Sequence, residues 1–258
     1  MTTLLLQLAG PLQAWGSSAR FVQRTTESCP TKSGVLGLLA AAEGRSRDAD
    51  LSDLTALRFG VRIDQPGSRI KDFHKAENPA TGRVMPLSDR YYLADAVFVA
   101  GVEGEDEFVR RLHAATAAPR FLPYLGRRSC PPSRPLLFEE SLSDLPLEQA
   151  LRDAPWRASR WYVRQQERAG ETVGAGTQEA PEELDLLFDC PSGETPDFSL
   201  RDAPLTFAPS HRQYQMRGVR TSHVDAPPSH DPTFHLRPAP PDPMSGAEAS
   251  APSPTDVP

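Results

Sequence analysis

The sequence predicts an α+β protein whose first half is a ferredoxin-like (RRM-like) sheet with two helices on one face. Apolar and amphipathic segments follow one another as strand–helix–strand, then an excursion, then strand–helix–strand, which is the split βαβ pattern. The excursion carries the turn residues of a β-hairpin. After about residue 140 the pattern weakens into strand-like segments and a proline-rich end.

The first strand–helix–strand unit spans residues 2–64. Residues 2–9 are a short apolar run closed by Gly10 and a proline, which favours a buried strand. In "PTKSGVLGLLAAAEG", Thr31 or Ser33 can cap a helix that Gly44 ends. Helical spacing of its apolar residues supports this, namely Val35, Leu38, Leu39 and Ala42. Residues 59–64 alternate like a half-buried strand.

The second unit repeats this order. Residues 95–102 read as a strand, and the segment that follows crowds acids at a helix start and stops at Pro119. Residues 135–140 are expected to form the fourth strand of the sheet. The segment 11–30 between the first strand and helix reads as loop.

The excursion, residues 66–94, is predicted to be a projecting β-hairpin, or thumb. Arms around 69–73 and 83–87 flank the turn sequence "NPATG". Basic side chains dominate it: Lys71, His74, Lys75, Arg83 and Arg90.

Three parts are therefore expected along the chain. Residues 1–138 form the ferredoxin-like domain with the thumb at 66–94, and residues 139–224 form a small accessory β-domain. Residues 225–258 hold ten prolines in thirty-four positions and bury too little apolar surface to offset the entropy of ordering, so we expect a disordered tail.

Charge is unevenly divided. Residues 1–134 hold 18 Lys and Arg against 14 Asp and Glu, whereas the remainder holds 10 against 20, so a polyanion site is expected in the first half. The three cysteines are widely spaced and each precedes a proline, which indicates neither a disulfide framework nor a metal site. With no signal peptide and no apolar run of membrane-spanning length, the expected location is the cytoplasm, away from membranes.

The arginine pair Arg127–Arg128 is the strongest sign of a site. No Asp or Glu occurs between Glu107 and Glu139, yet six arginines do. Two planar guanidiniums in a glycine-flanked turn suit phosphate oxygens, and Tyr124 offers a ring on which a base can stack. The alternative is that tertiary structure brings carboxylates to this pair.

The helix start "TKSGVLG" is a second candidate. It lacks the glycine that a P-loop requires before the lysine, which argues against a P-loop nucleoside triphosphatase. Lys32, Ser33 and the free N–H groups of the helix start still form a general anion site. Ordinary capping and close packing explain the same residues equally well.

Signs of catalysis are few. His74, with Lys71 and Tyr91, has the residue types for metal-independent acid–base cleavage of RNA. The remaining histidines lack metal-ligand spacing, and no metal or other cofactor is expected.

Several strings in this chain resemble the CasD family of type I-E CRISPR Cascade subunits, within the repeat-associated mysterious protein superfamily. They are "LQLAGPLQAWG", "PTKSGVLGLLAAAEG", "KDFH", "YYLADAVFVAGV" and "PRFLPYLGRRSCPPSRPL", in order over residues 4–138. The resemblance implies a ferredoxin-like domain with a hairpin thumb and a small C-terminal β-domain. It also implies a subunit that holds the 5′ handle of the CRISPR RNA (crRNA) and contacts the CasC backbone subunit and the large CasA subunit. The thumb would cross the start of the guide–target duplex, so target DNA lies nearby.

The resemblance also assigns residues to the RNA handle. From the loop after the first strand it implies Trp15 and Gly16, with Arg20 and Arg24. The helix start contributes Lys32, Ser33 and Gly34. The "YLGRRS" turn contributes Tyr124, Gly126, Arg127, Arg128 and Ser129. Lys71 and His74 would lie at the base of a thumb that looks short.

Two functions follow from this reading. The first is a non-catalytic RNA-binding subunit of Cascade. The alternative is an endoribonuclease that processes precursor crRNA, as relatives in the type I-C system do, with His74, Lys71 and Tyr91 in catalytic roles.

Overall fold

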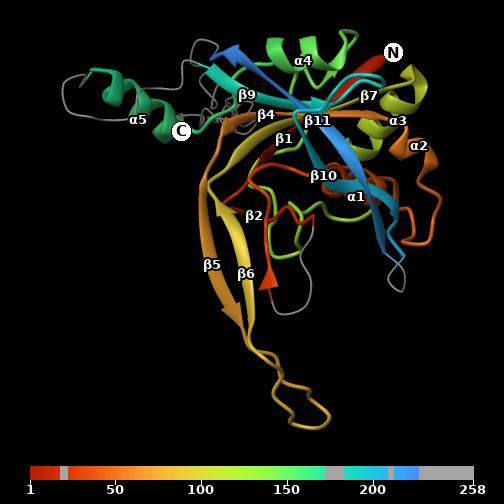
Figure 1. Cartoon of the computed structure of the whole chain (residues 1–258), viewed down its shortest axis with the longest axis vertical. Helices are drawn as coiled ribbons and strands as arrows, with labels where there is room; N and C mark the ends of the chain where they lie inside the picture. The colour runs from red at the N-terminus through yellow and green to blue at the C-terminus, as the bar shows by residue number, and fades with distance from the viewer. Residues whose placement is uncertain (18–22, 172–182, 209–211, 227–258) are drawn as a thin grey trace, which may run out of the picture.

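The protein is built on a seven-stranded antiparallel sheet with strand order β10-β11-β9-β4-β7-β1-β8 (Figure 1). The computed structural model describes residues 1–17, 23–171, 183–208 and 212–226. The predicted tail therefore lies outside the described residues from 227 onward, and so does Arg20.

The predicted central strands are confirmed. β1 (Thr2–Ala9) pairs along its whole length with β7 (Val97–Gly104), and β7 pairs in turn with β4 (Arg58–Gln65). Every residue of β1 and β7 is buried, because side chains on both faces of these strands are covered. The sheet can therefore hold loops at its edge in fixed positions.

Two helices cover one face, as predicted. α1 (Lys32–Glu43) begins at Thr31, whose hydroxyl accepts from the Gly34 amide, and ends at Gly44 with a φ of 78°. α3 (Asp106–Ala117) begins at Glu105, whose carboxylate accepts from two backbone amides of its first turn. Apolar side chains of both helices pack on β1, β4 and β7 to form the main core, among them Leu4, Leu6, Leu36, Leu39, Phe59, Phe98 and Leu112.

The opposite face is covered by α4 (Leu147–Asp153), whose leucines pack against Leu5 and Val99. Beneath the end of α4, Arg62 and Asp64 form a fully buried ion pair of 2.7 Å. Arg62 also donates to carbonyls of the 151–155 segment, so this pair fixes the chain that follows α4 to the sheet. The short α2 (Ser52–Thr55) and α5 (Arg160–Glu171) complete the helices of the described ranges.

Strands from the second half of the chain extend the same sheet. β9 (Glu183–Asp189) pairs with β4, and β11 (Gln213–Asp225) lies between β9 and β10 (Phe198–Thr206). Residues from both predicted domains thus share one hydrogen-bonded sheet. β10 has no clear counterpart in the sequence analysis, because its alternation is broken by bulges at 201–206.

The excursion forms the predicted hairpin, which extends away from the sheet (Figure 1). β5 (Ser68–His74) coincides with the first predicted arm, but the second arm at 83–87 is wrong: β6 spans Ser88–Ala94. Residues 75–87 form the tip, with a single bridge between Glu77 and Val84. Pro86 lacks an N–H and cannot extend the ladder. Within the predicted loop 11–30, β2 (Leu12–Gln13) and β3 (Gln23–Arg24) pair with the other edge of β6.

The fourth predicted strand is also wrong. Residues 135–140 run irregularly along the edge of β1 that does not face β7, and the Leu136 carbonyl accepts from the Gln7 amide. At this edge only β8 (Leu142–Ser143) pairs with β1 as a strand. Pro135 has no N–H, and the Phe138 amide bonds to the Ser141 hydroxyl instead of a neighbouring strand.

Candidate nucleic-acid interface

The "YLGRRS" turn, residues 124–129, docks on the loop that leaves β2. The Ala14 amide donates to the Leu125 carbonyl at 3.1 Å, and the turn is closed by a bond from the Leu125 amide to the Cys130 carbonyl. Gly126 has a φ of 82°, and a Cβ there would lie 1.8 Å from the Ala14 carbonyl oxygen. Only glycine lets the two backbones approach this closely, so the turn has one position on the body.

That position places the Arg127 side chain in contact with both β3 and β6. Its Nη2 donates to the Arg24 carbonyl at 2.8 Å and to the Thr25 carbonyl at 3.4 Å. Its guanidinium carbon lies 4.7 Å from the centroid of the Tyr92 ring, a cation–π contact. Nη1 of Arg127 is buried and has no hydrogen-bond acceptor among the described residues. One side of the guanidinium is thus held by the protein while a donor is left unused.

Arg90 brings a second unused donor to the same place. β3 and β6 are parallel and pair Arg24 with Arg90, and Arg90 lies on the same face of β6 as Tyr92, two residues away. Its Nε is buried, and no acceptor for it occurs in the described part of the chain. Arg24 and Arg128 are exposed. Arg127 thus contacts the Tyr92 ring, Arg90 lies on the same strand face as Tyr92, Arg24 is paired with Arg90, and Arg128 is the next residue of the turn.

Two of the nearby carboxylates are engaged elsewhere: Glu27 accepts from the Ser17 hydroxyl, and Asp89 pairs with Lys71 at 2.9 Å. Asp72 is opposite Arg90 in the β5–β6 register and lies 2.8 Å from His74 Nε2. Among the described residues, neither Arg127 nor Arg128 forms an ion pair. The cluster of Arg24, Arg90, Arg127 and Arg128, hereafter the arginine cluster, thus carries an excess of positive charge.

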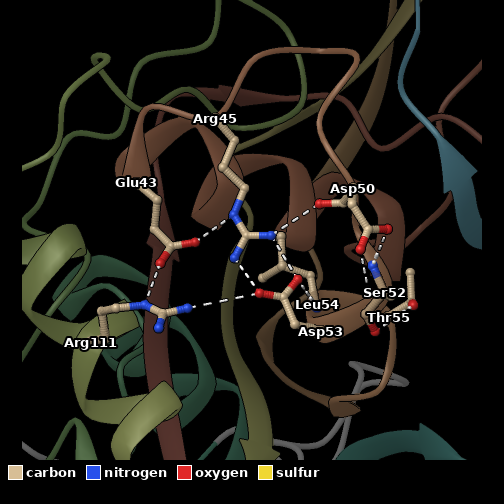
Figure 2. A network of polar contacts seen from close by, with 8 residues as sticks. All are labelled: Glu43, Arg45, Asp50, Ser52, Asp53, Leu54, Thr55 and Arg111. Atoms are coloured by element: carbon tan, nitrogen blue, oxygen red, sulfur yellow. Dashed lines mark hydrogen bonds and ion pairs between the residues drawn. The ribbon is translucent and has the colours of Figure 1, made fainter.

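Other arginines of the acid-free interval do find carboxylates through tertiary structure. Figure 2 shows Arg111 donating to Glu43 at 3.0 Å within a network that also includes Arg45 and Asp53. Arg110 pairs with Asp106 on its own helix. The arginines of α3 therefore have carboxylate partners, and Arg111 ties α3 to α1 and α2. The arginines of the turn have no such partners among the described residues.

The helix start does not present the site that the sequence suggests. Lys32 is buried, and its Nζ donates to Asp189 at 2.8 Å and to the Leu57 carbonyl at 2.7 Å. Its backbone amide donates to Asp202, which also pairs with Arg217. Carboxylates from β9 and β10 thus occupy the place of an external anion, and we do not retain Lys32 as a phosphate ligand.

The helix-start neighbours of Lys32 are packing residues too. Ser33 is buried. A Cβ on Gly34 would lie 2.8 Å from the Trp15 ring, and Trp15 itself is fully buried with its indole N–H bonded to Gln13. Trp15 supports the loop from beneath and has no exposed face on which a base could stack. The sequence indicated the importance of these residues but not their role.

The remaining predicted RNA ligands lie at the surface. Gly16 and Ser129 are exposed, and Tyr124 is half-buried. On the hairpin, Lys75 and Arg83 are exposed near the tip. Tyr92, which stands beside the catalytic candidate Tyr91, was not predicted as part of the RNA-binding site, although its spacing from Arg90 on a strand is the signal that places both on one face.

The three candidate catalytic residues are divided between two faces of the hairpin. Lys71 and Tyr91 are directly opposite each other in the β5–β6 register, whereas His74 is opposite Ser88, and odd and even positions of a strand face opposite sides. The Asp89 carboxylate raises the pKa of Lys71, which opposes a role as a general base. In the described ranges no helix is long and apolar enough to cross a membrane, and no group of three His, Cys, Asp or Glu residues is placed to hold a metal.

Comparison with known proteins identifies the family. The model of the family described as CRISPR-associated protein (Cas_Cas5) matches residues 3–220. The chain belongs to this Cas5 family. The CRISPR system Cascade subunit CasD of Escherichia coli strain K12 is 37% identical over 154 residues, which are 52% of this chain and 68% of that protein.

Two solved structures resemble this Cas5-family chain over most of its length. A crystal structure of a Cas protein is 36% identical with a TM-score of 0.64, covering 87% of this chain and 95% of the other. A chain from a CRISPR RNA-guided surveillance complex is 30% identical with a TM-score of 0.66, covering 87% and 91%. The mixed α/β fold with large antiparallel sheets is therefore that of Cas5 structures.

Proposed function

We propose that this protein is a non-catalytic RNA-binding subunit of a type I-E Cascade complex and that it holds the 5′ handle of the crRNA. The relationship to CasD and to a chain of an RNA-guided surveillance complex supports the assembly. The observation that carries the RNA site is the pair of buried, acceptor-free donors at Arg90 and Arg127. An arginine N–H without a partner is costly, and a backbone phosphate supplies the missing acceptor.

The arginine cluster suits a bent, single-stranded leader better than a duplex. Arg127 is held by carbonyls of β3 and the Tyr92 ring, so its free N–H is fixed in direction before RNA arrives. Exposed Arg24 and Arg128 then extend the positive surface on either side. Half-buried Tyr124 offers a stacking surface next to the turn. Preorganised charge of this kind strengthens binding because little side-chain entropy is lost.

The domain organisation belongs to the same proposal. β1, α1, β4, β7, α3 and β8 occur in split βαβ order, with β4-β7-β1-β8 adjacent in the sheet, which supports a ferredoxin-like domain. Its fourth strand, β8, extends this domain a few residues past the predicted boundary at 138. Residues 139–224 would be an accessory β unit that widens this sheet. In the complex, contacts with CasC and CasA and a position of the hairpin near target DNA are expected from the family relationship.

The enzyme alternative has less support. Two of its three residues face away from the third across the hairpin. Incubation of the purified protein with repeat RNA in a chelator decides the matter. We expect no cleavage; metal-independent cleavage that is lost in His74→Ala would establish the endoribonuclease instead.

Direct binding tests the RNA proposal. Purified protein is titrated with guide RNA that carries the 5′ handle and with the same RNA lacking it. We expect tighter binding of the handle-bearing RNA, weakened in Arg127→Ala and unchanged in Arg110→Ala, whose arginine pairs with Asp106 on α3. Equal binding of the two RNAs would contradict handle recognition.

A further inference from the structure

A second cluster of hydrogen-bond donors, two arginines and one glutamine, lies on the α4 side of the sheet. It consists of Gln7 on β1, Arg157 in the segment after α4, and Arg134 in the segment that follows the turn. Gln7 shares a sheet face with Leu5, which packs against α4. The family comparison assigns nothing to these three residues.

Gln7 and Arg157 are locked together in a way that leaves donors over. Nε and Nη2 of Arg157 both donate to Gln7 Oε1, at 2.9 and 2.7 Å. The guanidinium lies 4.8 Å from the Phe138 ring centroid. Arg157 is 6% exposed and Gln7 is 1% exposed, yet no residue that the structure describes supplies an acceptor to Arg157 Nη1 or Gln7 Nε2. Two deeply buried donors are thus unsatisfied, and the side chains that carry them are joined through Gln7 Oε1.

Among the described residues, neither Arg134 nor Arg157 forms an ion pair of its own, although two carboxylates attract Arg157 from nearby. Arg134 Nη1 donates to the Arg157 carbonyl at 3.1 Å, which brings a second guanidinium beside the first. The buried carboxylate nearby, Asp64, pairs with Arg62 and accepts from the Arg157 backbone amide. Glu140 is exposed and attracts Arg157 from farther away than an ion pair, which favours the charged guanidinium. Burial lowers the pKa of both Arg134 and Arg157, with their mutual repulsion adding to it for Arg157.

We propose that Gln7, Arg134 and Arg157 form a binding site for a phosphate-type oxyanion. An ion of this class accepts several hydrogen bonds at once and neutralises charge, as a guanidinium fork requires. A water molecule satisfies the donors less well, because its own two hydrogens would face cations and further donors. The site thus requires a negatively charged ligand, which distinguishes it from a cavity that a water molecule fills.

Two sources of the oxyanion are compatible with this chemistry: free inorganic phosphate and a backbone phosphate of bound RNA. Arg134 follows Arg127 by seven residues, so the Cα atoms of the two residues can be at most about 25 Å apart. An RNA held at the turn is therefore within reach of the second site. The existence of the site does not rest on the proposed function, since free phosphate alone can reveal it.

Thermal unfolding of the full chain in inorganic phosphate, against chloride at matched ionic strength, tests the proposal. We expect phosphate to raise the Tm by about 3 °C or more at ten times its dissociation constant. Arg134→Gln should lose this rise. Gln7→Glu should lose it as well and should have a higher Tm without phosphate, because the new carboxylate replaces the external anion beside Arg157. Arg110→Gln, which removes an arginine that pairs with Asp106 on α3 and lies in neither site, should keep it.

Contrary outcomes are distinct. A wild-type Tm that responds equally to phosphate and chloride would overturn the proposal, as would a rise that survives in both Arg134→Gln and Gln7→Glu. A rise lost only in Arg127→Gln would assign phosphate to the turn and likewise overturn it. Repeating the titration with handle RNA bound separates the sources: a response abolished by RNA identifies a backbone phosphate, and a response that persists identifies free phosphate.

Discussion

The guanidinium of Arg127 lies 4.7 Å above the ring of Tyr92. This contact joins the turn at residues 124–129 to the base of the hairpin, and it holds the Arg127 guanidinium beside β3. If the arginine cluster binds RNA, the hairpin and the turn must be positioned together, because each contributes one of the two unsatisfied donors.

Replacement of the Tyr92 ring should therefore weaken RNA binding without removing any charge. Tyr92→Leu is expected to lower handle affinity by about three- to tenfold, the size of a lost cation–π contact. Tyr92→Phe, which keeps the ring, should bind like the wild type. Affinity is measured on protein shown to be folded by circular dichroism. Equal affinity of the two variants would mean that the ring does not position Arg127.

Lys32 should matter for stability and not for RNA. Lys32→Met removes one partner of a buried ion pair, and we expect a loss of about 3 kcal/mol in the free energy of unfolding. The loss is at the low end for such pairs because Asp189 keeps its bond to Arg217. Urea unfolding measures it, and handle affinity of the folded variant should be unchanged. Weak RNA binding at full stability would restore Lys32 as an RNA ligand.

Gly126 should be required for docking of the turn. Gly126→Ala places a Cβ against the Ala14 carbonyl as well as straining a φ of 82°. Gly193→Ala is a matched control, because its φ is 90° and no atom lies within 4 Å of the added Cβ. We expect the first variant to lose about 2 kcal/mol more stability than the second, measured by urea unfolding, together with RNA affinity. Equal losses would show that the turn can shift without cost.

Cys29 should make the protein less stable in alkali. Burial raises the pKa of its thiol from 9.0 to about 12, so the folded state keeps a proton that the unfolded chain releases. The unfolded state then binds fewer protons above pH 9, and stability falls as pH rises from about 9 to about 12. At pH 10.5 the expected loss is about 2 kcal/mol relative to pH 8.

Cys29→Ala separates this thiol from other groups that titrate in alkali. The variant should lose less stability between pH 8 and pH 10.5 than the wild type in urea unfolding. Parallel curves for the two proteins would show that the Cys29 thiol does not contribute.

Much of the fold could be predicted because local signals agree with tertiary packing. Thr31 and Gly44 mark the ends of α1, and the apolar run of β1 is buried on both faces. The failures occur where local signals are weak. Prolines interrupt the hydrogen bonding of residues 83–87 and 135–140, so their apolar side chains do not indicate a ladder.

The site was predictable only in part for a related reason. An acid-free interval singles out the Arg127–Arg128 turn as a candidate, since acids close in sequence are the nearest partners that a turn has, and its role in RNA binding stays a prediction. Sequence cannot show which distant carboxylate reaches a buried lysine, and Asp189 and Asp202 arrive at Lys32 from strands more than 150 residues away. Nor does it show that Arg90 and Arg127 converge, which depends on the parallel pairing of β3 with β6.

The salt dependence of handle-RNA binding tests the central claim most directly. Each phosphate contact to a single strand contributes about 0.7 to the slope of log affinity against log salt concentration. The Arg127→Ala/Arg128→Ala double variant should bind more weakly by about 1–3 kcal/mol for each arginine, with a slope shallower by about 1.4. An affinity and a slope equal to those of the wild type would show that the RNA lies elsewhere.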